Sequence, residues 1–269
     1  MADGTIRPFI SMCVMFDKLR GYYLTAVSDL RYQGGEVLLW RVVVKLLSPL
    51  VRLDQQILFE IDLTGSLEAR QPKVDVVITR AGPDDIDDIL DMQMQLLTPQ
   101  EIAQLSDSEE LQYAQLLRVR KTAYDEYAAA MRAGEESYIA RENGAMVHSN
   151  WIRFHDNAPM GGRPVDLKPG EVYTTDAHTA QSRRGFGIHE AVLMHMLQVA
   201  QRRGCHRAYT ITDLTKAGSR RGVKRVGWQR RGNILYVTPR GLQRTWLVRL
   251  GGDLEPMFNH ARASVRVED

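Results

Sequence analysis

The most informative segment of this sequence is Ser182-Arg183-Arg184-Gly185-Phe186-Gly187-Ile188-His189. It follows a run typical of a β-strand, residues 171–178, and it opens an apolar periodicity typical of a helix that extends to Arg203. Such a strand, Gly-x-Gly turn and helix start form an anion site, because glycines let the backbone approach a phosphate and the first helical turn presents free N–H groups. Arg183 and Arg184 add positive charge beside the turn.

The turn differs from two other phosphate-binding loops. No Gly-Lys-Ser/Thr follows the glycines, so the stretch is not a P-loop, and Glu190 stands where a dinucleotide-binding fingerprint has its third glycine. A Gly-x-Gly turn also occurs as a plain connection between a strand and a helix. The order of the neighbouring elements therefore carries more weight than the turn itself.

Composition sets the broad class. The chain has 269 residues, of which 44% are hydrophobic and 25% charged, as in a soluble globular protein of one or two domains. The formal charge of +2 gives no argument for a nucleic-acid partner. Cys13 and Cys205 lack metal-type spacing, which predicts a reducing compartment and no metal site. The first residues lack the basic region of a signal peptide, so we expect a cytoplasmic protein.

Residues 1–72 differ from the rest and are expected to form an N-terminal helical extension before a main domain at 73–269. Within it we predict helices over 16–30 and 36–51, a strand over 56–63 and a linker over 64–72. The second helix carries basic residues that are expected near one face: Arg41, Lys45 and Arg52. Two interpretations stay open, a helix packed on the domain with solvated charges, or a basic amphipathic surface over 36–52 that contacts a membrane or an acidic carrier protein.

From residue 74 the predicted order is strand, two helices, hairpin, strand, glycine turn, helix, strand, helix, strand. The hairpin is marked by Asn143-Gly144, a dipeptide suited to a tight turn. The predicted elements are a strand over 74–80, helices from 83 and over 99–133, strands over 137–141, 145–154 and 171–178, a helix to 203, a strand over 205–212, a helix over 215–226 and a strand over 232–237.

This order, with these residues, resembles the GNAT superfamily of acyl-CoA-dependent N-acyltransferases over about residues 74–237. Four segments carry the resemblance: the opening strand and helix at 78–85, the hairpin at 138–144, the glycine turn at 183–188 and the helix at 219–228 that ends in Val226-Gly227-Trp228. The resemblance implies an α/β (α+β) fold, with a mixed, mostly antiparallel sheet and helices on both faces, preceded by the N-terminal helical extension.

The resemblance also implies an activity and a donor. It predicts transfer of an acyl group, acetyl in the first place, from acetyl-CoA or another acyl-CoA to a primary amine of a small molecule or sugar. The residues expected to bind the donor lie in the glycine turn and in the last helix: Arg183, Arg184, Gly185, Phe186, Gly187, Ile188, His189 and Ser219.

Three positions depart from the family pattern. Ser182 stands where the loop usually has Gln or Arg, and Lys216 replaces a common Asn. Val223 stands where many members have the tyrosine that protonates the leaving thiolate. An acyltransferase with this sequence therefore needs another general acid, or it releases the thiolate without one.

In the family mechanism the amine attacks the thioester directly, so a base is expected beside the strand that precedes the glycine turn. The candidates on that strand are Glu171, Asp176 and His178, and His148 lies on the strand before it. Asp176 and His178 are two residues apart, which places them on the same face of a strand. An imidazole suits the role because its pKa lies near neutral pH.

The remaining sequence features leave alternatives open. Residues 202–231 are strongly basic, which suits a solvated face, the 3′-phosphate of CoA or an acidic acyl-carrier protein. A long-chain acyltransferase fed by such a carrier is one alternative, and a non-catalytic CoA-binding module is another. A homodimer is compatible with each of them. The acceptor amine and the acyl chain length are not fixed by the sequence.

Overall fold

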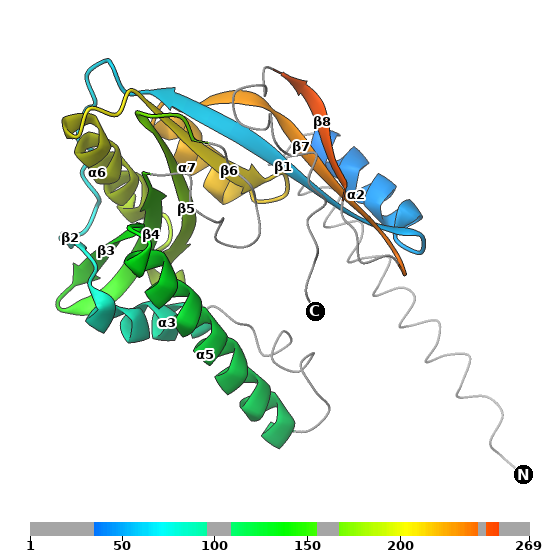
Figure 1. Cartoon of the computed structure of the whole chain (residues 1–269), viewed down its shortest axis with the longest axis horizontal. Coiled ribbons are helices and arrows are strands. Elements are labelled where there is room, and N and C mark those ends of the chain that lie inside the picture. Colours follow the sequence, from blue (N-terminus) through cyan, green and yellow to red (C-terminus); the bar gives the residue numbers. More distant parts are fainter. Residues whose placement is uncertain (1–34, 96–108, 155–166, 242–245, 253–269) are drawn as a thin grey trace, which may run out of the picture.

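Eight strands form one sheet in the computed structural model, which describes residues 35–95, 109–154, 167–241 and 246–252 (Figure 1). The strand order is β2-β3-β4-β5-β6-β1-β7-β8. Neighbouring strands are antiparallel except β5 and β6, which are parallel. The strands are β1 Val51–Asp62, β2 Val77–Arg80, β3 Glu136–Glu142, β4 Ala145–Arg153, β5 Glu171–Thr179, β6 Arg207–Asp213, β7 Gln229–Pro239 and β8 Trp246–Gly252.

Helices cover both faces of this sheet, so the predicted fold class is confirmed. They are α2 Gly35–Leu47, α3 Ile86–Met94, α5 Glu109–Arg132, α6 Ile188–Arg202 and α7 Ala217–Arg225, with short 3-10 turns at Pro83–Asp85 and Gln181–Arg183. Strand β3 shows the two layers, because its side chains alternate between faces. Ile139 packs in the cluster of α3 and α5, whereas Tyr138 and Ala140 pack in the cluster of α6.

The strand predicted in the N-terminal extension lies inside the sheet. β1 pairs with β6 on one side and with β7 on the other, both antiparallel. Its side chains Ile57, Phe59 and Ile61 pack in the same core as α6 and α7. Residues 51–62 therefore belong to the sheet of the main domain, although the chain reaches them before the predicted boundary at residue 72.

Helix α2 is shorter than predicted. The sequence interpretation extended it to Val51, but it ends at Leu47 and β1 begins at Val51. Pro49 explains the difference, because proline lacks the N–H that a continuing helix needs. The Ser48 hydroxyl donates to the Lys45 carbonyl oxygen at 2.9 Å and closes the last turn. Arg52 thus lies in β1 rather than on the helix with Arg41 and Lys45.

The other predicted elements from 74 to 237 are found within a few residues of their expected bounds. Strand β7 extends further than predicted on both sides, and β8 was not predicted. Predictions for residues 16–30 and 99–108 lie outside the described residues. Among the described helices, none is long and apolar enough to cross a membrane.

Candidate functional site

The ladder between β5 and β6 ends halfway along β5. The two parallel strands pair from Glu171 with Arg207 to Thr174 with Thr210. β5 continues to Thr179 and remains paired only with β4, while β6 continues to Asp213 beside β1. The backbone of residues 175–179 thus has a free edge toward β6, in the middle of the sheet.

A β-bulge at Asp176 marks the point where the strands part. Ser149 of β4 pairs with His178 and Trp151 pairs with Thr175, so β5 holds one residue more than β4 between these pairs. Asp176 has a φ of 53°, a left-handed conformation that aspartate tolerates better than most residues. Such a bulge redirects a side chain relative to a regular strand. Here the carboxylate reaches the helix α5.

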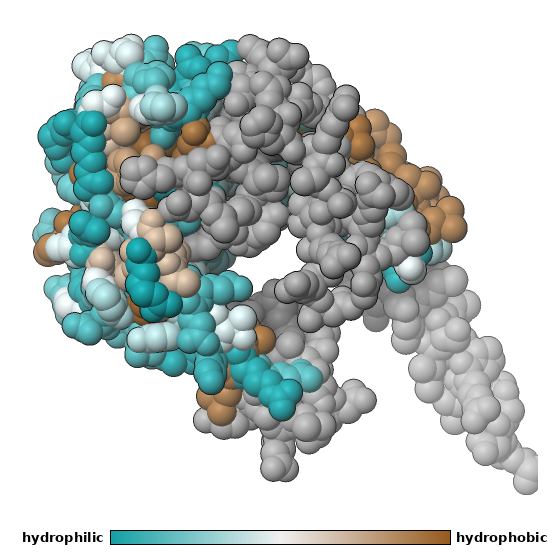
Figure 2. Space-filling view, viewed as in Figure 1, coloured by the Kyte–Doolittle hydropathy of each residue, from teal (hydrophilic) through white to brown (hydrophobic). Residues whose placement is uncertain are grey.

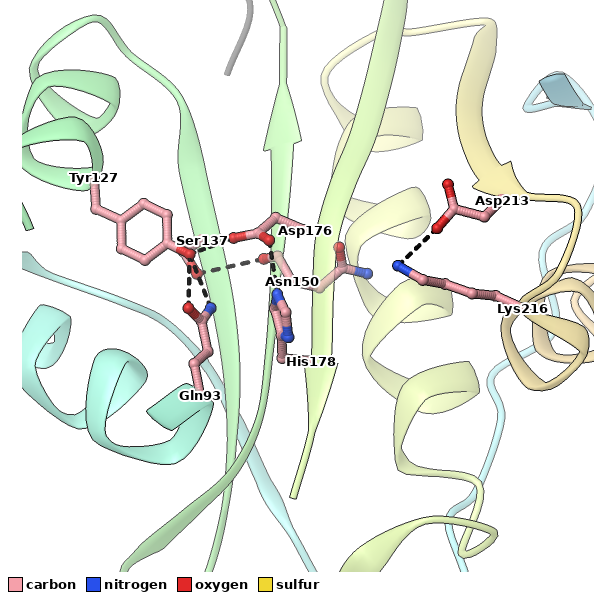
Figure 3. Close-up of polar contacts among 8 residues, drawn as sticks. All are labelled: Gln93, Tyr127, Ser137, Asn150, Asp176, His178, Asp213 and Lys216. Atoms are coloured by element: carbon pink, nitrogen blue, oxygen red, sulfur yellow. Dashed lines mark hydrogen bonds and ion pairs between the residues drawn. The ribbon is translucent and has the colours of Figure 1, made fainter. Parts of the chain in front are cut away.

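Asp176 is the centre of a hydrogen-bonded chain on the α3–α5 face of the sheet (Figure 3). Its Oδ1 lies 2.7 Å from Nε2 of His178, and its Oδ2 accepts from the Tyr127 hydroxyl at 2.5 Å. The Tyr127 oxygen in turn accepts from Nε2 of Gln93 at 2.8 Å. The Tyr127 ring also packs on Trp151, with a centroid distance of 4.8 Å. Packing and hydrogen bonds together fix the direction of the carboxylate.

The electrostatics keep this carboxylate ionised. Burial by itself raises the pKa of Asp176, but hydrogen bonds from His178 and Tyr127 and the charge of His178 outweigh it, so the pKa lies below its usual value. Burial and the Asp176 charge raise the pKa of Tyr127 far above its usual value, so the phenol remains a donor. The side chain of His178 is 34% exposed. An ionised carboxylate thus favours the tautomer of His178 that carries its proton on Nε2.

His148, the third catalytic candidate, lies on the opposite face. It is fully buried, its Nδ1 is 2.8 Å from the Thr179 hydroxyl, and its ring lies 5.4 Å from that of His189 on α6. Burial first, then the nearby His189 and His178, lower the pKa of His148 well below its usual value. Its Nε2 has no hydrogen-bond partner among the described residues. The structure therefore separates His148 from Asp176 and His178.

Glu171, the remaining candidate base, lies at the other end of β5. Its carboxylate is 2% exposed, accepts from the Tyr209 hydroxyl at 3.1 Å and lies 3.8 Å from Arg207. The free half of β5 begins only at residue 175, so Glu171 is distant from it along the strand. Its contacts give it a structural role.

The glycine turn lies at the N-terminus of α6, where the sequence predicted it. Gly185 and Gly187 have φ values of 83° and 79°, a region that favours glycine. A Cβ on Gly185 would meet no described atom within 4 Å, whereas one on Gly187 would lie 3.7 Å from Cα of Pro72. Among the described residues, the N–H groups from Gly185 to Glu190 have no acceptor. The turn therefore presents free donors beside an open glycine.

The other predicted donor-binding residues differ in accessibility. Arg183 forms an ion pair with Glu142, while Arg184 is exposed and its Nε lies 3.4 Å from the Thr179 carbonyl oxygen. Ile188 is buried, and Phe186 packs against the main core. Nε2 of His189 is buried without a described partner, and burial lowers its pKa. Of the two arginines in the turn, Arg184 is thus the one without an ion pair among the described residues.

Helix α7, which carries Ser219, packs against the first turn of α6. Gly222 makes this possible, because a Cβ there would lie only 3.0 Å from Cδ2 of His189. Ser219 is half-buried one turn before Gly222. Val223 is buried in the core, so no side chain reaches solvent from the position of the family tyrosine.

The other two departures from the family pattern are exposed. Lys216 forms an ion pair with Asp213 at 2.8 Å, and Ser182 lies on the surface. No group of three or more metal-binding side chains occurs within the described ranges.

Sequence reasoning missed Tyr127 and Gln93. Tyr127 belongs to a long helix whose apolar spacing indicates packing, and nothing near it in the sequence points to Asp176. A buried tyrosine needs a partner for its hydroxyl, and that rule was the only available signal. The partner itself, 49 residues further along the chain, follows only from the fold.

Comparisons with known proteins concern the fold. No protein-family model matches the sequence, and no curated protein matches it. A functionally unknown conserved protein from Staphylococcus epidermidis matches with a TM-score of 0.50 and 14% identity, over 75% of this chain and 67% of that one. An acetyltransferase from the GNAT family from Colwellia psychrerythraea matches with a TM-score of 0.46 and 13% identity, over 70% of this chain and 56% of that one.

A predicted acetyltransferase from Clostridium acetobutylicum, solved with acetyl-CoA, matches with a TM-score of 0.40 and 20% identity, over 58% of this chain and 90% of that one. The chain thus spans little more than half of the Colwellia protein. Solved structures similar to this chain thus include an acetyltransferase described as a GNAT-family member, at low identity.

Proposed function

We propose that this protein is a GNAT-type N-acyltransferase that moves an acyl group, acetyl in the first place, from acyl-CoA to a primary amine. One observation carries the proposal. The ladder between β5 and β6 ends beside an Asp176–His178 pair on one face of the sheet, and the glycine turn precedes the helix that covers the other face. A donor and an acceptor can thus approach the free edge of β5 from opposite faces.

The glycine turn is the proposed site for the pyrophosphate of the donor. The free N–H groups from Gly185 to Glu190 and the positive end of the α6 dipole suit an anion, and the open side of Gly185 lets it approach the backbone. Arg184 supplies a neutralising charge. The backbone of Lys73 lies beside the turn, since its N–H donates to the Phe186 carbonyl oxygen at 2.8 Å.

The free half of β5 is the proposed site of reaction. Its unpaired N–H groups can donate to the thioester carbonyl oxygen and to the oxyanion that develops there. The amine nitrogen attacks the carbonyl carbon, the C–N bond forms and the C–S bond breaks. The proton of the amine moves to Nδ1 of His178, and the CoA thiolate takes its proton from solvent, since Val223 supplies none.

His178 is the proposed base because it combines exposure with an orienting carboxylate. Asp176 fixes the tautomer with the proton on Nε2 and stabilises the imidazolium that forms at Nδ1. Tyr127 and Gln93 hold Asp176 in turn. Tyr127 and Gln93 therefore act as positioning residues.

Calorimetric titration with acetyl-CoA, followed by a thiol-release assay over a panel of primary amines, tests the proposal. We expect micromolar binding and turnover above background with at least one amine. Binding without turnover on any amine would favour the non-catalytic CoA module. No binding of acetyl-CoA or of a long-chain acyl-CoA would refute the proposal.

A carrier-fed long-chain acyltransferase is the second candidate, favoured by the charge of α7. Arg221, Lys224 and Arg225 are exposed on this helix, which has no acidic residue. An acidic carrier protein complements such a surface. Faster turnover with carrier-bound than with CoA-bound acyl groups would place this candidate first.

A further inference from the structure

Helix α2 and the turn after it expose a stripe of aliphatic side chains. The exposed fractions are 65% for Leu39, 48% for Val42, 73% for Leu46, 39% for Leu47 and 71% for Leu50. Figure 2 shows the same feature as a hydrophobic band on the right of the molecule, over α2. Single exposed apolar residues are common on protein surfaces, but a contiguous group of this kind marks an interaction site.

The stripe is not the side by which α2 packs on the domain. Val37 is fully buried and Trp40 packs against the main core, so these residues form the inner side of the helix. Leu39, Val42 and Leu46 follow one another at spacings of three and four residues, which places them along one side of a helix. Helix α2 is therefore apolar both toward the sheet and away from it.

The charges beside the stripe are basic, and the acidic residue at the start of α2, Glu36, forms an ion pair with Arg230 at 2.9 Å. Residues 37–53 contain Arg41, Lys45 and Arg52 and no Asp or Glu. Arg240 adds to them from the turn after β7, because its Nε donates to the Ser48 carbonyl oxygen at 2.6 Å and its N–H donates to the Leu50 carbonyl oxygen at 3.0 Å. Lys45, Arg52 and Arg240 are exposed, so the end of the stripe near Leu46 and Leu50 has a basic rim.

We propose that this stripe, residues 39–50 with its basic rim, docks the protein on an anionic phospholipid surface. Aliphatic side chains with flanking Lys and Arg are the composition of helices that lie in a membrane interface, where the apolar side enters the acyl boundary and the bases meet lipid phosphates. The hot spots of protein–protein interfaces are instead enriched in Trp, Tyr and Arg, whereas the exposed large apolar side chains of this stripe are Leu and Val. The proposal is independent of the acyltransferase activity.

Vesicle flotation of the full chain tests the proposal, with phosphatidylcholine alone or mixed with phosphatidylglycerol. We expect flotation with the anionic mixture, weaker flotation with the neutral lipid and a decline with added salt. Leu46→Ser/Leu50→Ser should lower partitioning about tenfold or more, because two exposed leucines no longer enter the lipid. Lys45→Glu/Arg52→Glu should remove the preference for the anionic mixture.

The matched control is Leu117→Ser/Val119→Ser on α5. These side chains are 49% and 55% exposed and lie on another helix, so their loss should leave flotation unchanged. Circular dichroism confirms that each variant is folded. Equal flotation of the α2 and α5 variants, or no flotation of the wild type, would overturn the proposal. So would a wild-type dimer without flotation that Leu46→Ser/Leu50→Ser converts to a monomer, since the stripe would then join two copies of the chain.

Discussion

His178 and His148 lie on neighbouring strands, one on each face of the sheet, and their surroundings differ in every respect that matters for proton transfer. His178 is one-third exposed and bonded to an ionised carboxylate. His148 is fully buried, bonded to the Thr179 hydroxyl and next to a second imidazole. Burial lowers the pKa of His148 so that it stays neutral at physiological pH.

Two residues of the same type thus have different surroundings because their side chains lie on different faces of the sheet. Both imidazoles come from the same stretch of sheet, where Ser149 pairs with His178 and His148 pairs with Thr179. The bulge at Asp176 supplies a carboxylate on one face alone. On the other face the first turn of α6 excludes water. The Asp176–His178 pair thus lies on the α5 face, whereas His148 is buried beside His189 on the α6 face.

Replacing each imidazole in turn tests the difference between the two histidines most directly. His178→Asn should lower turnover about 10²–10⁴-fold, the usual contribution of a general base, with unchanged acetyl-CoA affinity. His148→Asn should lower stability and leave turnover of the folded protein within a few-fold. Steady-state thiol release with calorimetry measures both. Similar losses of turnover in the two variants would contradict the assignment.

Asp176→Asn tests the carboxylate without changing the backbone. Asn tolerates the left-handed φ of 53°, so the bulge should persist. Loss of a charged hydrogen bond worth about 1.5–3 kcal/mol should lower kcat about 10–100-fold, with KM for the amine nearly constant. The kcat and KM of the variant decide the matter, and a change confined to KM would make Asp176 a substrate-binding residue instead.

Gly185→Leu tests the backbone donors that precede α6, and the chain offers a matched control. Gly185 and Gly204 both have a φ of 83°, and a Cβ on either meets no described atom within 4 Å. Both Leu variants therefore carry a similar strain of about 1–2 kcal/mol. Only Gly185→Leu should weaken acetyl-CoA binding, about tenfold or more, because the side chain fills the proposed pyrophosphate site. Equal affinities in the two variants would remove the glycine turn from the donor site.

The buried imidazoles predict a pH dependence of stability. Burial lowers the pKa values of His148 and His189 from 6.5. Below about pH 6.5 the unfolded chain therefore binds more protons than the folded chain. Stability should therefore be constant above about pH 7.5 and fall as the pH drops through 6.5, by up to about 1.4 kcal/mol per pH unit for each imidazole. His195, whose pKa is also lowered by burial, adds to the same trend.

Urea unfolding between pH 8 and pH 5.5 measures this slope. His148→Gln should flatten it, because this variant lacks one of the buried imidazoles that set the slope. A slope that is unchanged in His148→Gln would show that this imidazole is already protonated or exposed in the folded protein.

Local patterns were sufficient for most of the fold. The Asn143-Gly144 hairpin and the glycine turn before α6 are encoded by neighbouring residues, and both lie where they were predicted. Asp176 and His178 were selected because residues two apart share a strand face, and the structure does bring them together. The bulge that makes this contact depends on the register with β4, which no local pattern reveals.

Long-range pairing set the limit of prediction. The strand over 56–63 was expected in an extension, but its partners Thr212 and Asn233 are known only once the sheet has formed. The role of Tyr127 could not be predicted for the same reason, because its hydroxyl donates to Asp176 only when helix α5 packs on the sheet. The burial of His148 likewise depends on α6, whose His189 lies beside it although the two residues are far apart in the chain.

The position of β1 has a consequence for how the chain folds during synthesis. Ile57 pairs with Thr212 on one side and with Asn233 on the other. Strand β1 is therefore synthesised well before β6 and β7, its two partners in the sheet. Until β6 and β7 leave the ribosome, β1 has no strand to pair with and its apolar side chains are not buried. A fold rich in such distant contacts forms slowly, and its unpaired strand invites association with other chains. We therefore expect chaperone dependence to concentrate in the interval before β7 emerges.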